Sequence, residues 1–426
     1  MAGGSLHCAA SIVEGGFKPM HWESADAAAA GMNAAQLERI GEHLQSRYVA
    51  PGKIPGCVTL VVRRDRLAYL HVAGQRDRER DLPMAADTLF RIYSMTKPLT
   101  SVALMTLWEQ GCFTLDDPVH LYLPEWRDLR VRSGGSWPAF ETRAAQRPMR
   151  VRDLLAHTSG LTYDFLHASN LDAAYRELGV GRPAPGYTLE DMARQLAALP
   201  LEFSPGERWN YSLATDVLGL LIQRISGQPF EVYLRRTLFE PLAMSDTVFS
   251  PRDDQLPRFA ACYTRDDDGR LVVQDDPRRS EYRQRSFYSG GGGLLSTAGD
   301  YLRFCRMLAH GGTLDGRRII GRKTLEFMVA NHLPAGQDLA RLAVSGFSET
   351  HHEGVGFGLG FACKMDPVRS GFPASVGAYY WGGLASTLFW VDPAEELIVL
   401  FFTQLIPSST FNFRGQLEAL VYAALD

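Results

Sequence analysis

The chain has 426 residues, of which 46% are hydrophobic and 22% are charged, and its formal net charge is −4. This balance is typical of a large globular protein. Because no basic excess is present to neutralise a phosphate backbone, nucleic acid is excluded as an expected partner. The sequence holds no apolar run of about 18 residues, so we expect no membrane-spanning helix.

The cysteines are scattered and do not form a metal site. The six of them, at positions 8, 57, 112, 262, 305 and 363, contain no Cys-x-x-Cys pair and no metal-ligand spacing. We expect reduced, mostly buried thiols, with no metal and no cofactor. The stretch 1–20 lacks the basic region followed by an apolar region that marks a secretory signal, so the expected location is the cytoplasm.

The first third of the chain mixes helices and strands. Apolar residues at helical spacing predict an amphipathic helix over 34–48. Two β-rich runs, 56–62 and 67–73, are typical of a hairpin. A further helix is predicted from Ser94 to residue 110. It is apolar on almost every side, which indicates a buried helix, and Gly111 is expected to end it.

The middle of the chain, from about 131 to 285, is helical in character with interruptions by Pro and Gly. Loops rich in Asp and Arg are expected over 265–270 and 277–285. The candidate helices are 151–156, 189–198, 212–225 and 230–238.

β-rich signals return near the C-terminus. A helix is predicted over 297–308 with Thr297 as its N-cap. The runs 387–391 and 397–403 are typical of a second hairpin, and a terminal helix is expected over 411–425.

β signals at both ends with helices between them predict an α+β fold, in which one antiparallel sheet is built from both chain ends and flanked by helices. The expected domains are a discontinuous sheet domain, 1–130 with 286–426, and an inserted, mostly helical domain, 131–285. The active site would lie in the cleft between them.

Chemistry is first indicated by Ser94-Met95-Thr96-Lys97, a Ser-x-x-Lys sequence. On a helix, residues three apart face the same side at about 5–6 Å between their Cβ atoms. A serine hydroxyl needs a base to become a good nucleophile, and a lysine in apolar surroundings gives up its proton more readily. Taken alone, the motif is a weak signal, because a capping serine and a surface lysine would give the same spacing. That alternative is weakened here because an unpaired lysine on this mostly apolar helix would be costly.

Two further segments carry weaker signals. Tyr211 lies at the entry of an apolar helix, where it could point into a cleft and act as a base beside a lysine, or simply pack in the core. Gly382 and Gly383 precede the run 387–391. Paired glycines there indicate close approach of a ligand or another backbone, or a plain β-bulge.

Taken together, these segments resemble the family VIII carboxylesterases, which share the fold of class C β-lactamases and penicillin-binding proteins. The resemblance rests on Ser-Met-Thr-Lys at 94–97, Phe-Ser-Pro-Gly-Glu-Arg-Trp-Asn-Tyr-Ser at 203–212 and Trp-Gly-Gly at 381–383. His-Thr-Ser-Gly-Leu at 157–161, Leu-Phe-Glu-Pro-Leu-Ala-Met at 238–244 and the glycine run 290–293 support it. The likeness covers residues from about 50 to 405, in the family's order.

The resemblance implies a nucleophile and its partners. Ser94 would be acylated, Lys97 and Tyr211 would move the proton, and the sequence does not decide which of the two is the base. The backbone N–H groups of Ser94 and Leu384 would form the oxyanion hole. Trp381, Gly382 and Gly383 would contact the substrate, and no metal is implied.

Departures from the β-lactamase pattern shift the expected substrate. Leu213 stands where β-lactamases carry the Asn of Tyr-x-Asn, and Trp381 stands where they carry the Lys of Lys-Thr-Gly. Both changes remove groups that would hold a β-lactam, so neutral short-chain esters are expected, with weak hydrolysis of β-lactams such as cephalosporins.

Other functions stay open at this point. They are an acyltransferase of the same fold and a non-catalytic β-lactam-recognition protein. The expected partner is a small-molecule ester, without nucleic acid or membrane, and the oligomeric state is not given. A lipase-type α/β-hydrolase is excluded because no Gly-x-Ser-x-Gly occurs, and His351-His352-Glu353 lacks zinc-protease spacing.

Overall fold

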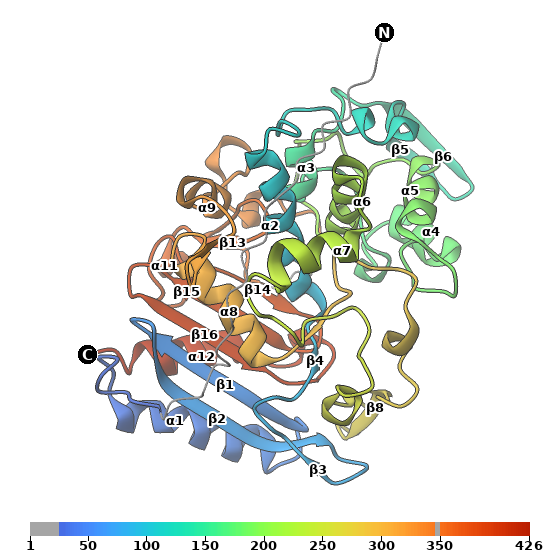
Figure 1. Cartoon of the computed structure of the whole chain (residues 1–426). Helices are drawn as coiled ribbons and strands as arrows, with labels where there is room; N and C mark the ends of the chain where they lie inside the picture. The colour runs from blue at the N-terminus through green and yellow to red at the C-terminus, as the bar shows by residue number, and fades with distance from the viewer. Residues whose placement is uncertain (1–24, 346–349) are drawn as a thin grey trace.

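The computed structural model describes residues 25–345 and 350–426 (Figure 1). An eight-stranded antiparallel sheet lies at its centre, in the order β12-β13-β14-β15-β16-β1-β2-β3. The strands are β1 (Gly56–Arg63), β2 (Arg66–Asp77), β3 (Leu82–Pro83), β12 (Val355–Phe357), β13 (Ala362–Lys364), β14 (Tyr379–Gly383), β15 (Thr387–Asp392) and β16 (Leu397–Phe402).

The two chain ends meet in the middle of this sheet. β1 pairs with β16, from Val58 opposite Phe402 to Arg63 opposite Leu397. β1, β15 and β16 are buried along their whole length, as expected of strands covered on both faces. The predicted sheet built from both ends of the chain is therefore confirmed, together with both predicted hairpins.

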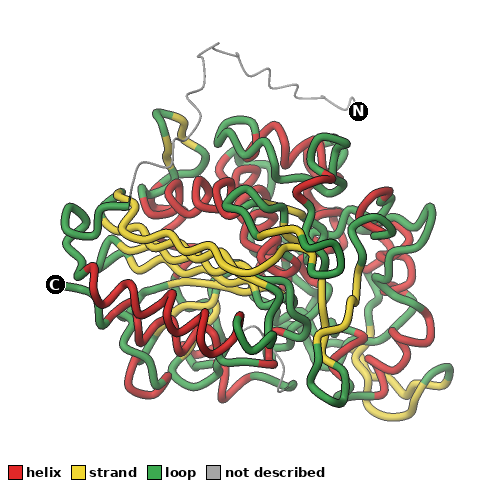
Figure 2. Tube along the Cα trace, turned by 90° about the horizontal axis from the view of Figure 1, so that it is seen from below, coloured by secondary structure: helices red, strands yellow, loops and turns green. Residues whose placement is uncertain are grey.

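Helices cover the two faces of the sheet (Figures 1 and 2). On one face α1 (Ala34–Leu44) packs beside α12 (Phe413–Tyr422), with Leu37, Ile40 and Leu44 of α1 buried. On the other face α8 (Ala298–Ala309) packs on β15 and β16. The predicted N-cap of α8 is confirmed, because the Thr297 hydroxyl accepts a hydrogen bond from the Asp300 N–H at 3.1 Å.

The buried helix predicted after Ser94 is α2 (Thr96–Glu109), and it packs against α6 (Ala214–Ser226). Two short strands set its position: β4 (Phe90–Arg91) pairs with β9 (Leu295–Ser296). The remaining longer helices are α3 (Val151–Leu155), α4 (Asn170–Leu178), α5 (Leu189–Ala197), α7 (Phe230–Leu234) and α9 (Arg322–Val329). Shorter helices are α10 (Leu339–Leu342) and α11 (Pro367–Ser370), and a small hairpin joins β10 (Thr313–Leu314) to β11 (Arg317–Arg318).

The middle of the chain is less purely helical than predicted. It contains two hairpins, β5 (Arg130–Ser136) with β6 (Ala139–Ala144) and β7 (Cys262–Arg265) with β8 (Leu271–Asp275). The loop predicted over 265–270 is the turn of the second hairpin. Since β6 and β8 have no fully buried residue, they lack the alternating apolar pattern by which a strand is recognised.

The surface and the cysteines fit a globular protein. Of the described cysteines, Cys57, Cys262, Cys305 and Cys363 are buried and Cys112 is exposed, and all five are free thiols. Cys8 and the stretch 1–20 lie outside the described residues.

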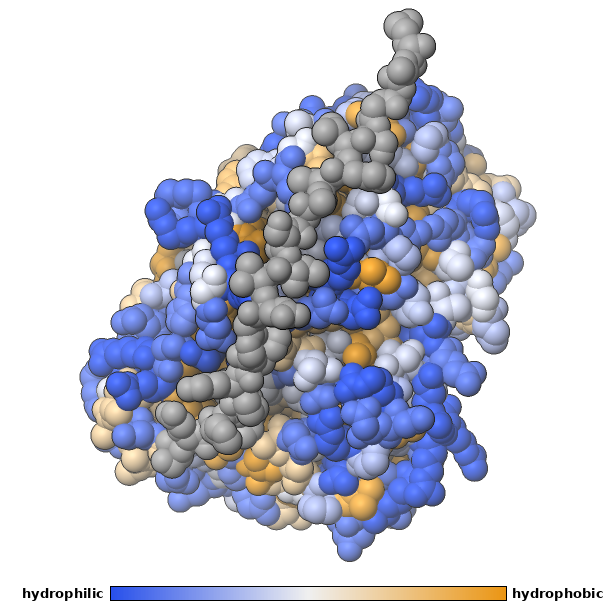
Figure 3. Space-filling model, in the orientation of Figure 1, coloured by the Kyte–Doolittle hydropathy of each residue, from blue (hydrophilic) through white to orange (hydrophobic). Residues whose placement is uncertain are grey.

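On the face in Figure 3, hydrophilic side chains predominate and apolar ones form small groups. Within 25–345 and 350–426, no helix is long and apolar enough to cross a membrane.

Candidate active site

Ser94 lies at the start of the buried helix. It is the second residue of a 3₁₀ turn, Tyr93–Met95, that runs directly into α2. The first N–H groups of a helix have no acceptor within it, so the Ser94 N–H is available to bind an anion. Tyr93 has a φ of 41°, a left-handed conformation that is costly for a bulky residue and is held where the chain leaves β4.

Lys97 lies one turn further along, and its amine points back to the serine. Lys97 Nζ is 3.2 Å from Ser94 Oγ and donates a second hydrogen bond to the Gly291 carbonyl at 2.8 Å. The side chain is buried, with Nζ 4.5 Å from the ring centre of Tyr211 and 5.1 Å from that of Tyr163. The local spacing of Ser and Lys thus places both groups together, as predicted.

Tyr211 reaches the same point from a distant part of the chain. Its hydroxyl donates to Ser94 Oγ at 2.5 Å, across 117 residues of sequence. The ring is fully buried and is fixed by aromatic neighbours, with ring centres 5.2 Å away at Tyr163, 5.3 Å at His157 and 5.5 Å at Trp381. The Ser94 oxygen therefore accepts hydrogen bonds from both the lysine and the tyrosine.

The glycine run 290–293 joins the helix of Ser94 to the helix that follows Tyr211. Thr100 on α2 donates to the Gly290 carbonyl at 2.8 Å, and the Gly291 N–H donates to Asp216 on α6 at 3.1 Å. A side chain at Gly290 would come within 2.6 Å of the Thr215 carbonyl. Because only glycine fits between α2 and α6 at this position, packing explains why residue 290 is a glycine.

Asp216 and His157 are residues of this site to which the sequence analysis gave no role. Burial raises the pKa of the Asp216 carboxyl, and the nearby Lys97 charge opposes that rise. Burial, assisted by Lys97, holds the pKa of His157 well below its usual 6.5, so this imidazole is neutral. The sequence signal for Asp216 is a carboxylate in the first turn of a helix that is otherwise apolar on its buried side.

The Trp-Gly-Gly segment forms the end of β14 instead of a turn before β15. A Cβ on Gly383 would overlap the carbonyl oxygen of Ile92, two residues before Ser94. This is the close backbone approach that the paired glycines indicated. The end of β14 contacts the 3₁₀ turn that carries Ser94. Leu384 follows directly in the turn to β15 and is half-buried.

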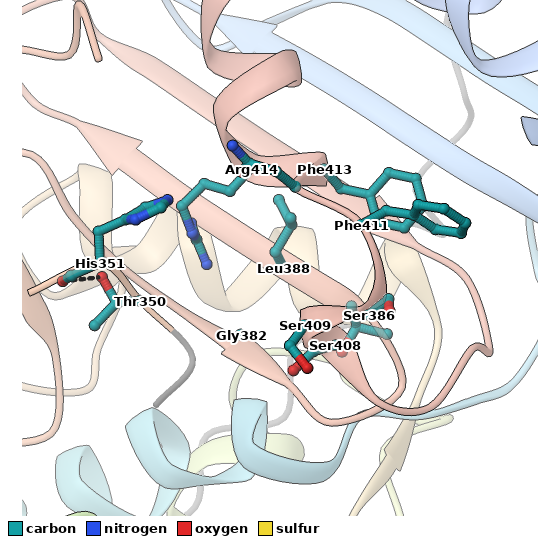
Figure 4. A pocket seen from close by; sticks show the side chains of 12 residues that line it. Thr350, His351, Gly382, Ser386, Leu388, Ser408, Ser409, Phe411, Phe413 and Arg414 are labelled. Carbon is teal, nitrogen blue, oxygen red and sulfur yellow. Dashed lines mark hydrogen bonds between the residues drawn. The ribbon is translucent and has the colours of Figure 1, made fainter. Parts of the chain in front are cut away.

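Trp381 and Gly382 face opposite sides of β14, since side chains alternate along a strand. Trp381 is fully buried and packs on Tyr211 and Phe357. Gly382 instead lines a cavity of about 270 Å³ (Figure 4). Arg414 extends from α12 into the wall of this cavity and donates to the Trp381 carbonyl at 2.8 Å. The other lining residues are Thr350, His351, Ser386, Thr387, Leu388, Ser408, Ser409, Phe411, Asn412 and Phe413.

Comparison with known proteins gives consistent matches over most of the chain. A family model described as Beta-lactamase matches residues 42–423. Protein Rv1367c of Mycobacterium tuberculosis is 36% identical over 359 residues, covering 84% of this chain and 87% of that protein. Esterase EstB of Burkholderia gladioli is 32% identical over 400 residues, covering 89% and 93%.

A solved structure is also similar. EstCE1, described as a hydrolase with promiscuous acyltransferase activity, superposes with a TM-score of 0.76 at 26% identity, covering 91% of this chain and 98% of that one. The eight-stranded sheet with helices on both faces is thus a fold already known among hydrolases.

Proposed function

Because the chain belongs to the Beta-lactamase family, we propose that it is a serine carboxylesterase that hydrolyses short-chain carboxylic esters through an acyl-enzyme on Ser94. One observation carries the proposal: Ser94 Oγ, in a largely buried site, accepts hydrogen bonds from Lys97 Nζ at 3.2 Å and from the Tyr211 hydroxyl at 2.5 Å. The similarity to an esterase over 89% of the chain supports the same reaction class.

Acylation begins with attack of Ser94 Oγ on the ester carbonyl carbon. The proton of the serine passes to the Lys97–Tyr211 pair, which touches that oxygen directly. The negative charge that forms on the carbonyl oxygen is bound by the N–H groups of Ser94 and Leu384. When the tetrahedral intermediate breaks down, the pair returns the proton to the departing alcohol.

Deacylation uses the same groups in reverse. A water molecule takes the place of the alcohol, gives its proton to the Lys97–Tyr211 pair, and attacks the acyl carbon bound to Ser94 Oγ. The proton then returns to the serine as the acid leaves. Neutral His157 lies 5.3 Å from Tyr211 between ring centres and adds no charge to the site.

Neutral esters are the proposed substrates because the site lacks two polar groups. A buried, apolar Leu213 follows Tyr211 where a side-chain amide would bind a β-lactam, and Trp381 replaces a lysine. We expect kcat/KM for a short-chain aryl ester to exceed that for nitrocefin. Comparable values for the two substrates would reverse this ranking.

Removal of any of the three groups should strongly reduce ester turnover. We expect Ser94→Ala to lower kcat roughly 10³-fold or more, with Lys97→Ala nearly as damaging, because the groups act as a unit. Tyr211→Phe should cost about 10²-fold or more through loss of proton transfer. The assay is hydrolysis of a short-chain aryl ester.

The matched control is Tyr233→Phe. Tyr233 is also a buried tyrosine, but its hydroxyl pairs with Thr106 at 2.8 Å and not with Ser94. Ester turnover by the Tyr233→Phe variant should therefore stay within a few-fold of wild type. Turnover that survives Ser94→Ala would show that the site has been misplaced. A folded wild-type protein without turnover, which nonetheless binds β-lactams, would favour the non-catalytic alternative.

Acyl transfer to an alcohol is the second candidate, and the similarity to EstCE1, a hydrolase with promiscuous acyltransferase activity, favours it. Hydrolase and transferase share the acyl-enzyme and differ in the acceptor. Increasing amounts of a small alcohol, added with a constant amount of ester, separate the two. A hydrolase gives mainly the free acid, whereas a transferase gives mainly the new ester.

A further inference from the structure

The buried carboxylate of Asp216 is joined to the amine of Lys97 through a single residue. Asp216 is in the first turn of α6, five positions after Tyr211. Its Oδ1 accepts a hydrogen bond from the Gly291 N–H at 3.1 Å, and the Gly291 carbonyl accepts from Lys97 Nζ at 2.8 Å. The hydroxyl of Ser289 donates to the same carboxylate oxygen. Gly291 therefore connects a carboxylate on α6 to an amine on α2.

The position of Gly291 leaves no room for a side chain. A Cβ there would overlap Asp216 Oδ2 and lie 2.8 Å from the Tyr163 hydroxyl. The absence of a side chain lets the Asp216 carboxylate reach the Gly291 N–H, while Lys97 binds the Gly291 carbonyl. The glycine is thus explained by the carboxylate, which would be costly to bury without the N–H and the hydroxyl that bind it.

The charges around this link are few. Burial raises the pKa of Asp216, and Lys97 is the main charge that opposes this rise. The neighbouring titratable groups are Tyr163 and Tyr211, whose rings face Lys97, Tyr187, whose pKa is raised by burial, and His157, whose pKa is held well below 6.5. Those two pKa directions keep Tyr187 and His157 neutral near pH 7, so neither residue adds a charge beside Lys97 and Asp216.

We propose that Asp216 is a positioning residue of the esterase site, which holds the Lys97 amine against Ser94 through Gly291 and sets how tightly that amine keeps its proton. The inference rests on the proposed function, because it assigns the proton of Lys97 a part in turnover. A carboxylate nearby favours the charged form of an amine. Without it, Lys97 would lose its proton at lower pH.

The test is the pH dependence of kcat/KM for a short-chain aryl ester in wild type and Asp216→Asn. Asparagine keeps the size and an acceptor for the Gly291 N–H but removes the charge. We expect the limb of the profile that follows Lys97 to move to lower pH by about one unit, since a neighbouring charge shifts a titration by that order. The direction is the same whether the active form of Lys97 is neutral or charged.

A control separates charge from packing. Asp172→Asn replaces another buried carboxylate in the first turn of a helix, where it binds the N–H groups of Ala168 and Ser169 and pairs with Arg176. That variant should lose stability without moving the limb.

Each result decides the proposal. An active wild type and an active Asp216→Asn protein with the same limb would overturn the role of Asp216 and leave the esterase function intact. A wild type without ester turnover would overturn the function itself. If Asp216→Asn does not fold, Asp216→Ser is measured in its place, and failure of both uncharged variants to fold would reject the positioning role in favour of a purely structural one.

Discussion

At the scale of single residues, the site separates into what is local in sequence and what is not. The contact of Ser94 with Lys97 follows from helical spacing and could be predicted from four residues. The contact with Tyr211 spans 117 positions, and no spacing rule reaches that far, so it was expected only from the resemblance to a family. Asp216 went unnoticed because a lone carboxylate on a helix is usually solvated.

The neutral imidazole of His157 makes a prediction about stability. In the unfolded chain a histidine takes up a proton below its usual pKa of 6.5, whereas burial keeps the folded-state pKa far lower. Below pH 6.5 the unfolded state therefore binds one more proton than the folded state, and the free energy of unfolding falls as the pH is lowered. The expected contribution is about 1.4 kcal/mol per pH unit.

His157→Asn should remove this contribution. Asparagine tolerates the left-handed φ of 54° at this position, so the backbone can be kept. The free energy of unfolding of the variant, measured by denaturant titration between pH 5 and 8, should depend less steeply on pH below 6.5 than that of wild type. Equal slopes in the two proteins would contradict the assignment of a buried, neutral histidine.

At the scale of elements, the helices and the central strands were predictable and the exposed hairpins were not. The predicted helix over 297–308 corresponds to α8 at Ala298–Ala309, and the strand predicted over 397–403 corresponds to β16. Buried elements carry a periodic apolar pattern. The strands of the β7–β8 hairpin pair mainly with each other, and β8 has no buried residue. Its sequence therefore shows no such pattern, and only the Asp- and Arg-rich turn over 265–270 could be recognised.

The end of β14 gives a prediction about the oxyanion hole. Gly383→Ala should push the strand away from Ile92, because its Cβ would overlap the Ile92 carbonyl oxygen, and so move the Leu384 N–H away from the Ser94 N–H. We expect kcat for aryl ester hydrolysis to fall by about 10²–10³-fold, as when one oxyanion donor is lost. Circular dichroism should show a retained fold.

The matched control for that change is Gly292→Ala, also beside the nucleophile. A Cβ at Gly292 would lie 3.7 Å or more from Tyr93, an ordinary contact, so turnover should remain within a few-fold of wild type. Equal losses in both variants would mean that the effect is general crowding, and undiminished turnover in Gly383→Ala would remove β14 from the oxyanion hole.

At the scale of the whole molecule, the fold explains why residues from three distant segments meet. β1 and β16 pair in the centre of the sheet, β4 and β9 bring the glycine run to the start of α2, and α2 packs on α6 behind Tyr211. The sheet built from both ends could be inferred from the order of β signals. The expected division into 1–130 with 286–426 and 131–285 stays a prediction.

Which side chains contact the substrate depends on strand register and packing, which the sequence does not show directly. Trp381 was expected to contact substrate, and this stays a prediction. Its ring packs on Tyr211 and Phe357, while Gly382 on the same strand lines a cavity. Which side of a strand faces the reaction depends on register and tertiary contacts, and a one-residue shift reverses it. The sequence alone therefore does not show which face of β14 lines the substrate site, because that depends on how the strands and helices pack.

The most direct test of the account is to trap the acyl-enzyme. The protein is treated with a slowly turned-over ester or a serine-reactive phosphonate, its intact mass is measured, and the modified peptide is sequenced by tandem mass spectrometry, with Ser94→Ala as the control. The account predicts one adduct per chain, on Ser94, absent from the variant and slowed in Lys97→Ala. An adduct on another residue, or equal labelling of Ser94→Ala, would contradict it.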